Sequence, residues 1–323
     1  MTKRLSLAIC EYDHCRDFTH GAVKAEGIEI ELNVLPIAEI FQRFTKNREW
    51  DVSEMSLGMY VSLLSQGDKG LTAIPVFTSR MFRLSAFYAR VGGPVKTLAD
   101  LRGKRVGYPD WMHTAGIFAR GYLKSELGIE LDEIEWVQAG VNAPGLQEIL
   151  PVKLPPSVKR SSRPDSSLDA LLMSGEIDAV VTSHPLTSSH GANPGSKRVL
   201  DDYVAAEKAY GKESGLFPIM HVVAIKKDAY DADPWIAKSL YAAFETAKAG
   251  SLARMRDSTI SRYPYPWSFA LAEEMSAMVG QDFWPYGIAR NKATLEAFLA
   301  YCAEQGVAHR PVALSELFAP GFD

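Results

Sequence analysis

The sequence of 323 residues has little cysteine and no long apolar run, and both deficits narrow the class of protein. Its three cysteines, Cys10, Cys15 and Cys302, are too irregularly spaced to form a disulfide framework. No apolar run approaches the roughly 18 to 20 residues that cross a bilayer, so we expect no membrane association. The apolar stretch at residues 5–10 is too short for a signal peptide. We therefore expect a cytoplasmic protein with free thiols.

An excess of positive charge is also absent. The chain carries 35 Lys and Arg against 39 Asp and Glu, a net charge of −4. Such a chain lacks the general attraction for phosphates that nucleic-acid binding needs, so any anionic ligand requires a local cluster of arginines or helix ends. Hydrophobic residues make up 47% of the sequence, which is typical of a globular protein, and the length indicates about two domains.

The sequence lacks the short motifs that hold common cofactors and metals. It contains no GxGxxG, Walker A, GxSxG, HExxH or CxxC pattern. The spacings of His14 to His20 and of His184 to His190 are not typical of metal ligands. We expect neither a cofactor nor a metal ion.

What the sequence does contain is an alternation of strand and helix patterns. Ile28, Ile30, Leu32 and Val34 alternate with polar residues, which is the period of a half-buried strand. Further strands are predicted at 5–9, 51–55 and 72–76, and helices at 37–44 and 57–64. Because strands alternate with helices, the pattern predicts a mostly parallel sheet.

A second series of the same kind follows. Its predicted strands lie at 82–90, 104–108, 136–137 and 177–181, and its helices at 97–101, 114–127 and 167–174. Residues 150–167 contain four prolines and several basic residues, a composition that predicts a long exposed loop. An apolar strand at 217–225 returns the chain to the first unit, and helices from 234, at 269–278 and at 291–305 complete it.

Several segments resemble the 4,5-dihydroxyphthalate decarboxylase family. They occur in order over nearly the whole chain, at residues 11–14 (EYDH), 21–28 (GAVKAEGI), 41–44 (FQRF), 50–56 (WDVSEMS), 73–80 (AIPVFTSR), 217–221 (FPIMH), 284–287 (WPYG) and 316–320 (ELFAP). The resemblance implies an α/β fold of the type II periplasmic-binding-protein kind, with two lobes of mixed sheet and a helical C-terminal tail. Residues 1–85 plus 222–323 would form one lobe and residues 86–221 the other, with a ligand cleft between them.

Two segments depart from the family pattern. They lie at residues 107–115 and 182–187, and both are expected to face the cleft, which leaves the identity of the substrate open. The basic segment at 150–167 resembles an insertion.

The resemblance implies non-oxidative decarboxylation of a hydroxylated, phthalate-like aromatic acid by protonation of its ring. The carboxylate leaves as carbon dioxide and a proton replaces it. This reaction needs an acid near the ring carbon, an acceptor for the phenol and cations for the remaining carboxylate. The small aromatic carboxylate is the partner that we expect, and the sequence leaves a homo-oligomer open.

Two histidines are candidates for the proton transfer. His221 lies in the apolar strand of the second crossover, and His14 follows the first strand with Asp13 beside it as a residue that could orient it. Imidazole titrates near neutral pH and serves as acid or base. We predict His221 as the acid and His14 as the partner of the phenol, with core packing as the alternative role for His221.

The substrate-binding candidates lie at strand and helix ends. Arg80 ends an apolar strand at the expected rim of the first sheet, and its planar fork suits a carboxylate; Arg83 and Arg16 are weaker alternatives. The helix that begins at Thr114 offers unpaired amides to an anion, and His113 precedes it. The remaining candidates are Ser53, Ser56, Asp13, Trp111 and His184.

Other functions stay open on the sequence alone. A solute-binding protein that only holds an organic anion is one alternative, and a menaquinone-pathway-type lyase of the same fold is another. A thiamine-precursor synthase of this fold is disfavoured because no cysteine cluster appears. The aromatic residues at 263–269 form either a lid or a packed loop.

Overall fold

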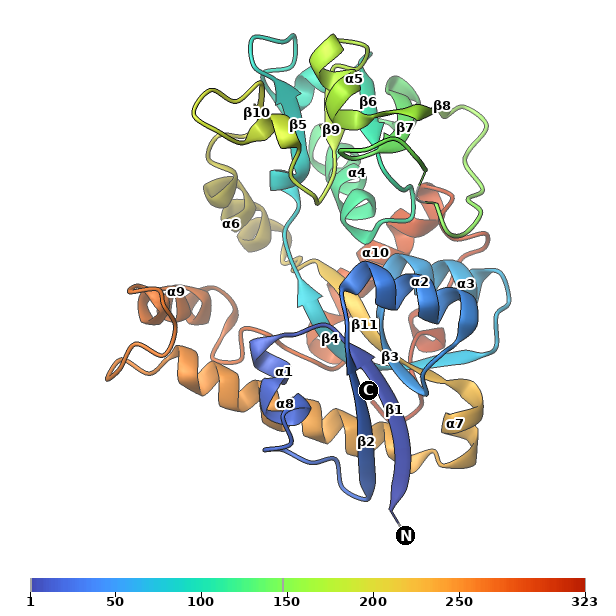
Figure 1. Ribbon diagram of the computed structural model, residues 1–323, viewed down its shortest axis with the longest axis vertical. Helices are drawn as coiled ribbons and strands as arrows, with labels where there is room; N and C mark the ends of the chain where they lie inside the picture. The colour runs from blue at the N-terminus through green and yellow to red at the C-terminus, as the bar shows by residue number, and fades with distance from the viewer. Residues whose placement is uncertain (1, 147, 323) are drawn as a thin grey trace.

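The computed structural model describes residues 2–146 and 148–322, which build two mixed β-sheets (Figure 1). One sheet has five strands in the order β2-β1-β3-β11-β4, and the other has six in the order β10-β5-β9-β6-β7-β8. Both sheets contain parallel and antiparallel pairs. The predicted α/β fold with two mixed sheets is therefore confirmed.

The five-stranded sheet is built from both ends of the chain. Its strands are β1 (Lys3–Ile9), β2 (Ile28–Val34), β3 (Val52–Ser56), β4 (Leu71–Arg80) and β11 (Ile219–Lys226). The helices between the first four are α1 (Asp13–Thr19), α2 (Ile37–Asn47) and α3 (Leu57–Ser65). All five residues of the central strand β3 are buried, whereas β2 at the edge keeps the alternating polar residues that predicted it.

The six-stranded sheet is built from the middle of the chain. Its strands are β5 (Phe87–Arg90), β6 (Arg105–Tyr108), β7 (Glu135–Gly140), β8 (Lys159–Ser167), β9 (Ala179–Val181) and β10 (Ser196–Arg198). Its helices are α4 (Thr114–Leu127), α5 (Leu168–Ser174) and α6 (Tyr203–Ser214). Short 3₁₀ turns occur at Leu84–Ala86, Leu98–Leu101, Leu131–Glu133, Thr187–Ser189, Ala289–Asn291 and Leu314–Glu316.

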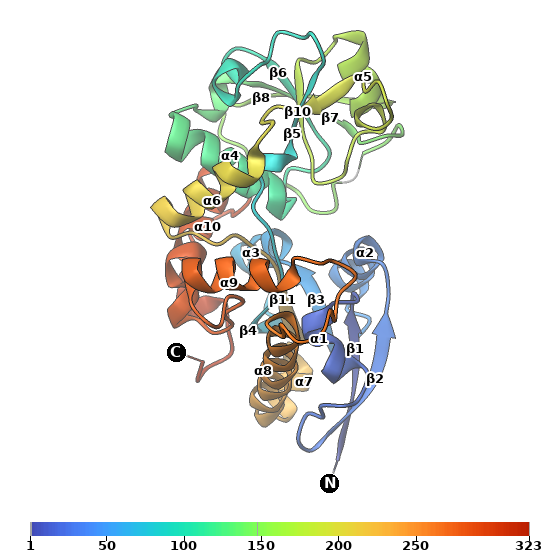
Figure 2. The ribbon, with the colours of Figure 1, turned by 90° about the vertical axis from the view of Figure 1, so that its left-hand side faces the viewer.

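The C-terminal helices join the two sheets. They are α7 (Lys227–Ala232), α8 (Trp235–Met255), α9 (Ser268–Val279) and α10 (Lys292–Glu304). Helix α10 lies beside α4 of the six-stranded sheet, where the rings of Phe298 and Phe118 stack at 4.9 Å (Figure 2). Helix α9 reaches α6 through an ion pair of 2.6 Å between Glu274 and Lys208. The tail therefore holds the two halves of the molecule in contact.

The chain crosses between the sheets twice. It leaves the first sheet after Arg80 and enters the second at Phe87, and it returns after Ser214 at Ile219. The limits that the sequence predicts for the lobes, at 85/86 and 221/222, stay a prediction; β11 of the first sheet begins at Ile219, before the second limit.

Two predicted elements differ in the structure. The expected strand at 82–90 is reduced to Phe87–Arg90, because a 3₁₀ turn occupies Leu84–Ala86. The expected loop at 150–167 contains strand β8, Lys159–Ser167. That strand pairs only with β7 at the edge of its sheet, where one side faces solvent and tolerates polar residues and a proline.

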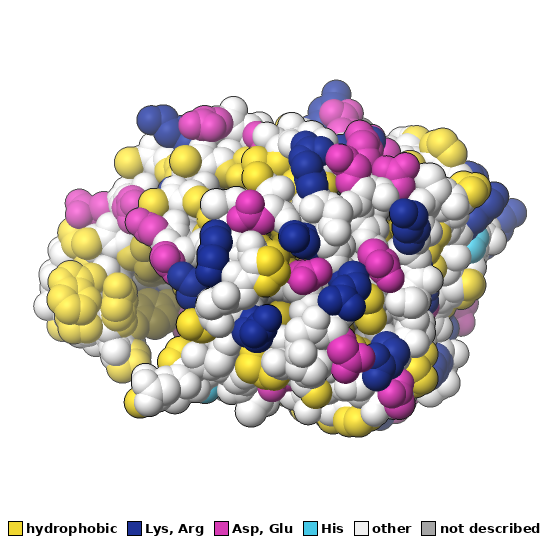
Figure 3. Space-filling model, turned by 90° about the horizontal axis from the view of Figure 1, so that it is seen from above, with side chains coloured by type: hydrophobic (Ala, Val, Ile, Leu, Met, Phe, Trp, Pro, Cys, Tyr) yellow, Lys and Arg dark blue, Asp and Glu magenta, His cyan; other side chains and the backbone are white. Residues whose placement is uncertain are grey.

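The surface carries charges of both signs. Seen from above the six-stranded sheet, basic and acidic side chains are interspersed (Figure 3). Among the residues described, no helix combines the length and apolar character needed to cross a membrane.

Candidate active site

Glu54 is the centre of a buried hydrogen-bond network in the first sheet. Its side chain is fully buried, and its carboxylate accepts hydrogen bonds from Tyr12 Oη at 2.6 Å, Thr78 Oγ1 at 2.8 Å and the Cys10 amide at 2.9 Å. His221 Nδ1 lies 2.7 Å from the same carboxylate. Burial opposes ionisation, but the bonds from His221 and Tyr12 outweigh it, so the pKa of Glu54 lies below its ordinary value.

His221 presents its second ring nitrogen away from this network. Strand β11 pairs His221 with Ser56 of β3 and Ser79 of β4, which places its ring at the end of the sheet nearest the second sheet. Because the ionised Glu54 can only accept a hydrogen bond, Nδ1 of His221 carries the hydrogen. The other ring nitrogen, Nε2, has no hydrogen-bond partner among the described residues. The His221 and Phe41 rings pack edge to face with their centroids 4.9 Å apart, which orients the imidazole further.

His14 lies close to this pair. Its ring packs 5.3 Å from that of Tyr12 and 5.0 Å from that of Trp284, and its Nε2 is buried without a hydrogen-bond partner. Burial lowers the pKa of His14 to about 4, so the ring is neutral at neutral pH. Its role as the partner of a phenol stays a prediction.

Asp13, at the start of α1, is bonded to residues of helix α8 and of the segment after it. Its carboxylate accepts hydrogen bonds from Ser251 Oγ, from Tyr263 Oη at 2.6 Å and from Arg254. These bonds attach α1 to α8 and to the aromatic segment after it. The expectation that Asp13 binds substrate stays untested, although all of these bonds occupy one oxygen, Oδ2.

The start of helix α4 meets the first sheet beside His221. Thr114 Oγ1 lies 2.9 Å from Ser56 Oγ and accepts a hydrogen bond from the Gly58 amide at 3.1 Å. His113 immediately precedes the helix, and its Nε2 lies 3.1 Å from Ser183 Oγ. The predicted residues Ser56, His113 and Thr114 are thus brought together between the two sheets.

Arg80 is buried and engaged by the protein itself. Its Nη1 donates to the Phe217 carbonyl at 3.0 Å, and its Nη2 donates to the Pro285 carbonyl at 2.6 Å and to Asn291 Oδ1. Burial lowers the pKa of Arg80 to about 9. Binding of a substrate by Arg80 stays a prediction, but these bonds give it a structural task that the sequence did not indicate.

The other predicted residues lie in different settings. Ser53 is fully buried and its hydroxyl donates to the Glu54 carbonyl at 2.9 Å. Trp111 is buried as well; its Nε1 donates to the Gln305 carbonyl at 2.8 Å. His184 is exposed, and its amide donates to Thr182 Oγ1 at 3.1 Å. Among the described residues, His221 forms its side-chain hydrogen bonds with Tyr12 and Glu54 and with none of these three.

Sequence comparison relates the chain to carboxy-lyases. No family model matches it. It is 32% identical over 318 residues to the 4,5-dihydroxyphthalate decarboxylase of Comamonas testosteroni, covering 98% of this chain and 96% of that enzyme. It is also 33% identical over 178 residues to the 4,5-dihydroxyphthalate decarboxylase of Pseudomonas putida, covering 55% of this chain and 69% of the relative. The chain belongs to the 4,5-dihydroxyphthalate decarboxylase family.

Structural comparison supports the fold that this family resemblance implied. The periplasmic aliphatic sulphonate-binding protein SsuA from Escherichia coli superimposes with a TM-score of 0.56 at 12% identity, covering 100% of this chain and 99% of SsuA. At 12% identity this match is evidence for the fold alone. This member of the decarboxylase family therefore has the predicted type II periplasmic-binding-protein fold.

Glu54 is the main residue of this decarboxylase-family site that the sequence analysis missed. It lies in the segment 50–56 that carries the family resemblance, between Ser53 and Ser56, the two residues that the sequence analysis predicts for the site. A carboxylate in the middle of a short strand whose other residues suit a core is itself a signal, because an ionised group is rarely buried without partners. Tyr12, which donates to Glu54, was likewise passed over in favour of the adjacent Asp13.

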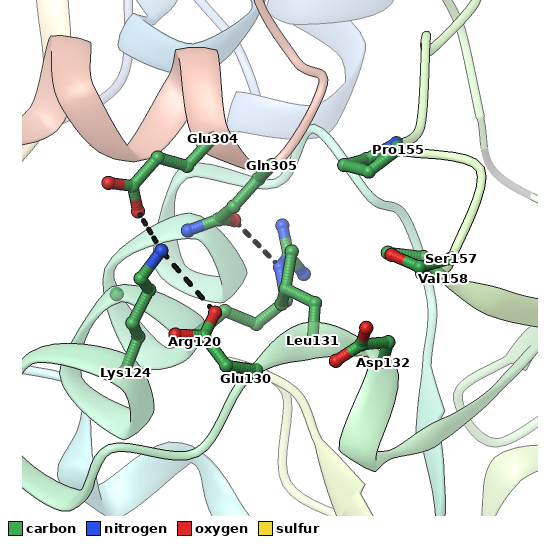
Figure 4. A pocket seen from close by; sticks show the side chains of 11 residues that line it. Arg120, Lys124, Glu130, Leu131, Asp132, Pro155, Ser157, Val158, Glu304 and Gln305 are labelled. Carbon is green, nitrogen blue, oxygen red and sulfur yellow. Dashed lines mark hydrogen bonds and ion pairs between the residues drawn. The ribbon is translucent and has the colours of Figure 1, made fainter.

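A second polar region lies between α4 and α10. It is a pocket of about 120 Å³ lined by Arg120, Lys124, Glu130, Glu304, Gln305 and their neighbours (Figure 4). Lys124 lies 3.4 Å from both Glu130 and Glu304, so its charge is already paired. The pocket shares no residue with the His221 network. Within residues 2–146 and 148–322, no group of three His, Cys, Asp or Glu side chains is placed to hold a metal ion.

Proposed function

We propose that the chain decarboxylates a hydroxylated aromatic acid of the 4,5-dihydroxyphthalate type by protonating its ring at His221. Family membership supports the class of reaction. The observation that carries the choice of site is the contact of 2.7 Å between the fully buried Glu54 carboxylate and Nδ1 of His221. A histidine held in this way keeps one tautomer and one orientation, as a proton donor requires.

The proposed reaction needs neither an oxidant nor a reductant. In 4,5-dihydroxyphthalate each carboxylate has a hydroxyl group para to it. Loss of the phenolic proton pushes an electron pair toward the ring carbon that bears the carboxylate, and that carbon takes a proton from the enzyme. The carbon–carbon bond to the carboxylate then breaks, its electron pair restores the aromatic ring, and carbon dioxide leaves. The proton that is consumed at the ring replaces the carboxylate that is lost.

His221 and Glu54 have different roles in the proposed proton transfer. Protonated His221 donates from Nε2, and the ionised Glu54 stabilises the positive ring through Nδ1. Tyr12 and Thr78 hold the carboxylate in place, since both hydroxyls donate to the same oxygen, Oε1. Glu54 is therefore a positioning residue in this proposal, and His221 is the catalytic residue. His14, neutral because of its burial, is proposed as the acceptor for the phenol.

A substrate panel tests the proposed function. The purified protein is incubated with 4,5-dihydroxyphthalate, phthalate and 3,4-dihydroxybenzoate, and released carbon dioxide is measured. We expect release from 4,5-dihydroxyphthalate and none from phthalate, which lacks the para hydroxyl group. In D₂O the product should carry one deuterium on the ring carbon that lost the carboxylate. Binding of every compound without carbon dioxide release would contradict the proposal and favour a solute-binding protein.

A further inference from the structure

We propose that Arg83 binds the carboxylate that the substrate keeps, and that it thereby selects aromatic dicarboxylates over monocarboxylates. This inference rests on the proposed function for the identity of the site, but it concerns binding alone. It assigns a ligand contact to a residue that the sequence analysis ranked below Arg80.

Arg83 lies in the first crossover between the sheets, directly before the 3₁₀ turn at Leu84–Ala86. Its Nε donates to Met220 Sδ at 3.3 Å, and Met220 is the neighbour of His221 in strand β11. The guanidinium is thereby held beside the strand that carries the proposed proton donor. The crossover places it where both sheets contribute side chains.

The guanidinium of Arg83 has no anionic partner within the part of the chain that the structure describes. The sulfur of Met220 is its one hydrogen-bond acceptor there, and Arg83 takes part in no ion pair of the described residues. Glu207, the acidic residue whose charge acts on Arg83, accepts instead from the Ser85 amide at 3.0 Å. A partly buried cation whose Nη groups have no acceptor among the described residues is suited to an anion supplied from outside.

Two other buried arginines donate more of their N–H groups to the protein than Arg83 does, although Arg80 Nε and Arg120 Nη1 are buried without a partner among the described residues. Arg80 donates to three acceptors of the protein. Arg120 donates from Nε to Gln305 Oε1 at 2.7 Å and from Nη2 to the Trp111 carbonyl at 2.5 Å, and it stacks on the Trp111 ring. The two Nη groups of Arg83 have no such acceptors among the described residues, and a carboxylate would fill both at once.

The surroundings of Arg83 fit a carboxylate on an aromatic ring. Burial lowers the pKa of His113 to about 3, and the charge of Arg83 acts in the same direction, so His113 is neutral. Ser183, 3.1 Å from His113 Nε2, adds a hydroxyl group. Burial lowers the pKa of Arg83 itself to about 10, which leaves it positive at neutral pH. A dicarboxylate could thus place one carboxylate at Arg83 and the other near His221.

The test compares dicarboxylate and monocarboxylate binding in variants of Arg83. Phthalate and benzoate serve as non-reacting probes in calorimetry, so the result does not depend on turnover. We expect Arg83→Gln to weaken phthalate binding about 30- to 1,000-fold and benzoate binding no more than about 3-fold. Arg83→Lys keeps the charge but loses the planar fork, and it should give an intermediate affinity for phthalate.

Arg105→Gln is the matched control. Arg105 is a half-buried arginine at the start of strand β6 that donates from Nη2 to the Gly175 carbonyl at 2.9 Å. Its variant loses the same charge away from Arg83 and His221 and should bind phthalate as the parent does. Melting temperatures show whether each variant is folded.

The outcomes separate this inference from the proposed function. If Arg83→Gln and Arg83→Lys fold and bind phthalate as tightly as the parent, the inference is wrong, whatever the parent does to 4,5-dihydroxyphthalate. If the variants lose phthalate but the parent releases no carbon dioxide, Arg83 is the anion ligand and the proposed reaction is wrong.

Discussion

Glu54 illustrates how one buried residue can determine the chemistry of several neighbours. It accepts from Tyr12, Thr78 and Cys10, and it lies within hydrogen-bond distance of His221. Burial and the negative charge of Glu54 both raise the pKa of Tyr12, so this hydroxyl stays protonated and keeps donating. The sequence predicted the strand that carries His221, but it could not show which side chains converge on Glu54, because these come from segments far apart in the chain.

The buried His14 predicts how stability responds to acid. Its pKa falls from 6.5 to about 4 in the folded chain, so the folded state binds fewer protons than the unfolded state between these values. The stabilisation from this group is fully present above pH 6.5 and is lost as the pH falls toward 4. At about 1.4 kcal/mol for each tenfold change in proton affinity, the full effect is roughly 3 kcal/mol.

His14→Phe tests this directly. The variant keeps an aromatic ring between Tyr12 and Trp284 but cannot titrate. Urea unfolding at several pH values should show a flatter decline in the free energy of unfolding between pH 6.5 and 4 than in the parent. His20→Phe, at an exposed position, is the control. An unchanged slope in His14→Phe would contradict the assigned pKa.

At the scale of elements, hydrophobic periodicity was reliable where a strand or helix is buried. Strands β1, β2 and β11 and helix α4 lie where their apolar patterns placed them, within a few residues. Strand β8 was missed because an edge strand needs no apolar pattern: its sequence, KRSSRPDSS, is almost wholly polar. Helices α1 and α6 were missed as well, since each buries only one or two residues and shows little periodicity.

The amide side chain of Gln305, at the end of α10, forms two hydrogen bonds to α4. Gln305 Oε1 accepts from Arg120 Nε at 2.7 Å, and Gln305 Nε2 donates to the Ile117 carbonyl at 2.9 Å. Gln305→Leu removes the acceptor and leaves a buried guanidinium short of a partner. We expect the free energy of unfolding to fall by about 2 to 4 kcal/mol, measured by urea titration.

Two further variants make this test specific. Gln281→Leu breaks an exposed bond to Arg256 and should change stability by no more than about 0.5 kcal/mol. The double variant Arg120→Met, Gln305→Leu contains no unpaired charge. Its loss of unfolding free energy should therefore be smaller than the sum of the losses measured in the two single variants. Strict additivity would show that the two side chains act independently.

At the scale of the whole molecule, the arrangement of two sheets places the site between segments that are remote in sequence. His221 and Glu54 come from the first sheet, His113 and Ser183 from the second, and Arg83 from the crossover. The resemblance of short segments to the decarboxylase family was enough to predict this fold, because the segments occur in order over nearly the whole chain. It could not predict that Arg80 would donate to Pro285 and Asn291 of the C-terminal tail, because those bonds depend on packing.

A ligand bound between the sheets should stabilise the whole chain. At 100 times its Kd a ligand adds about 2.7 kcal/mol. For a chain of this length the unfolding entropy is roughly 0.7 kcal/mol per kelvin, so the melting temperature should rise by about 4 °C. Calorimetric melting with 4,5-dihydroxyphthalate measures this, with catechol, which carries no carboxylate, as the control. Equal shifts with both compounds would argue against a carboxylate site.

The most direct test of the central claim is the rate of carbon dioxide release by His221→Asn in a single turnover of 4,5-dihydroxyphthalate. Asparagine keeps a similar size and some hydrogen bonding to Glu54, but it cannot deliver a proton near neutral pH. We predict a rate about 10² to 10⁴ times lower than that of the parent, with substrate affinity within about 3-fold and an unchanged rate in the exposed control His20→Asn. A folded His221→Asn variant that binds the substrate and releases carbon dioxide at the parental rate would contradict the assignment of His221 as the proton donor.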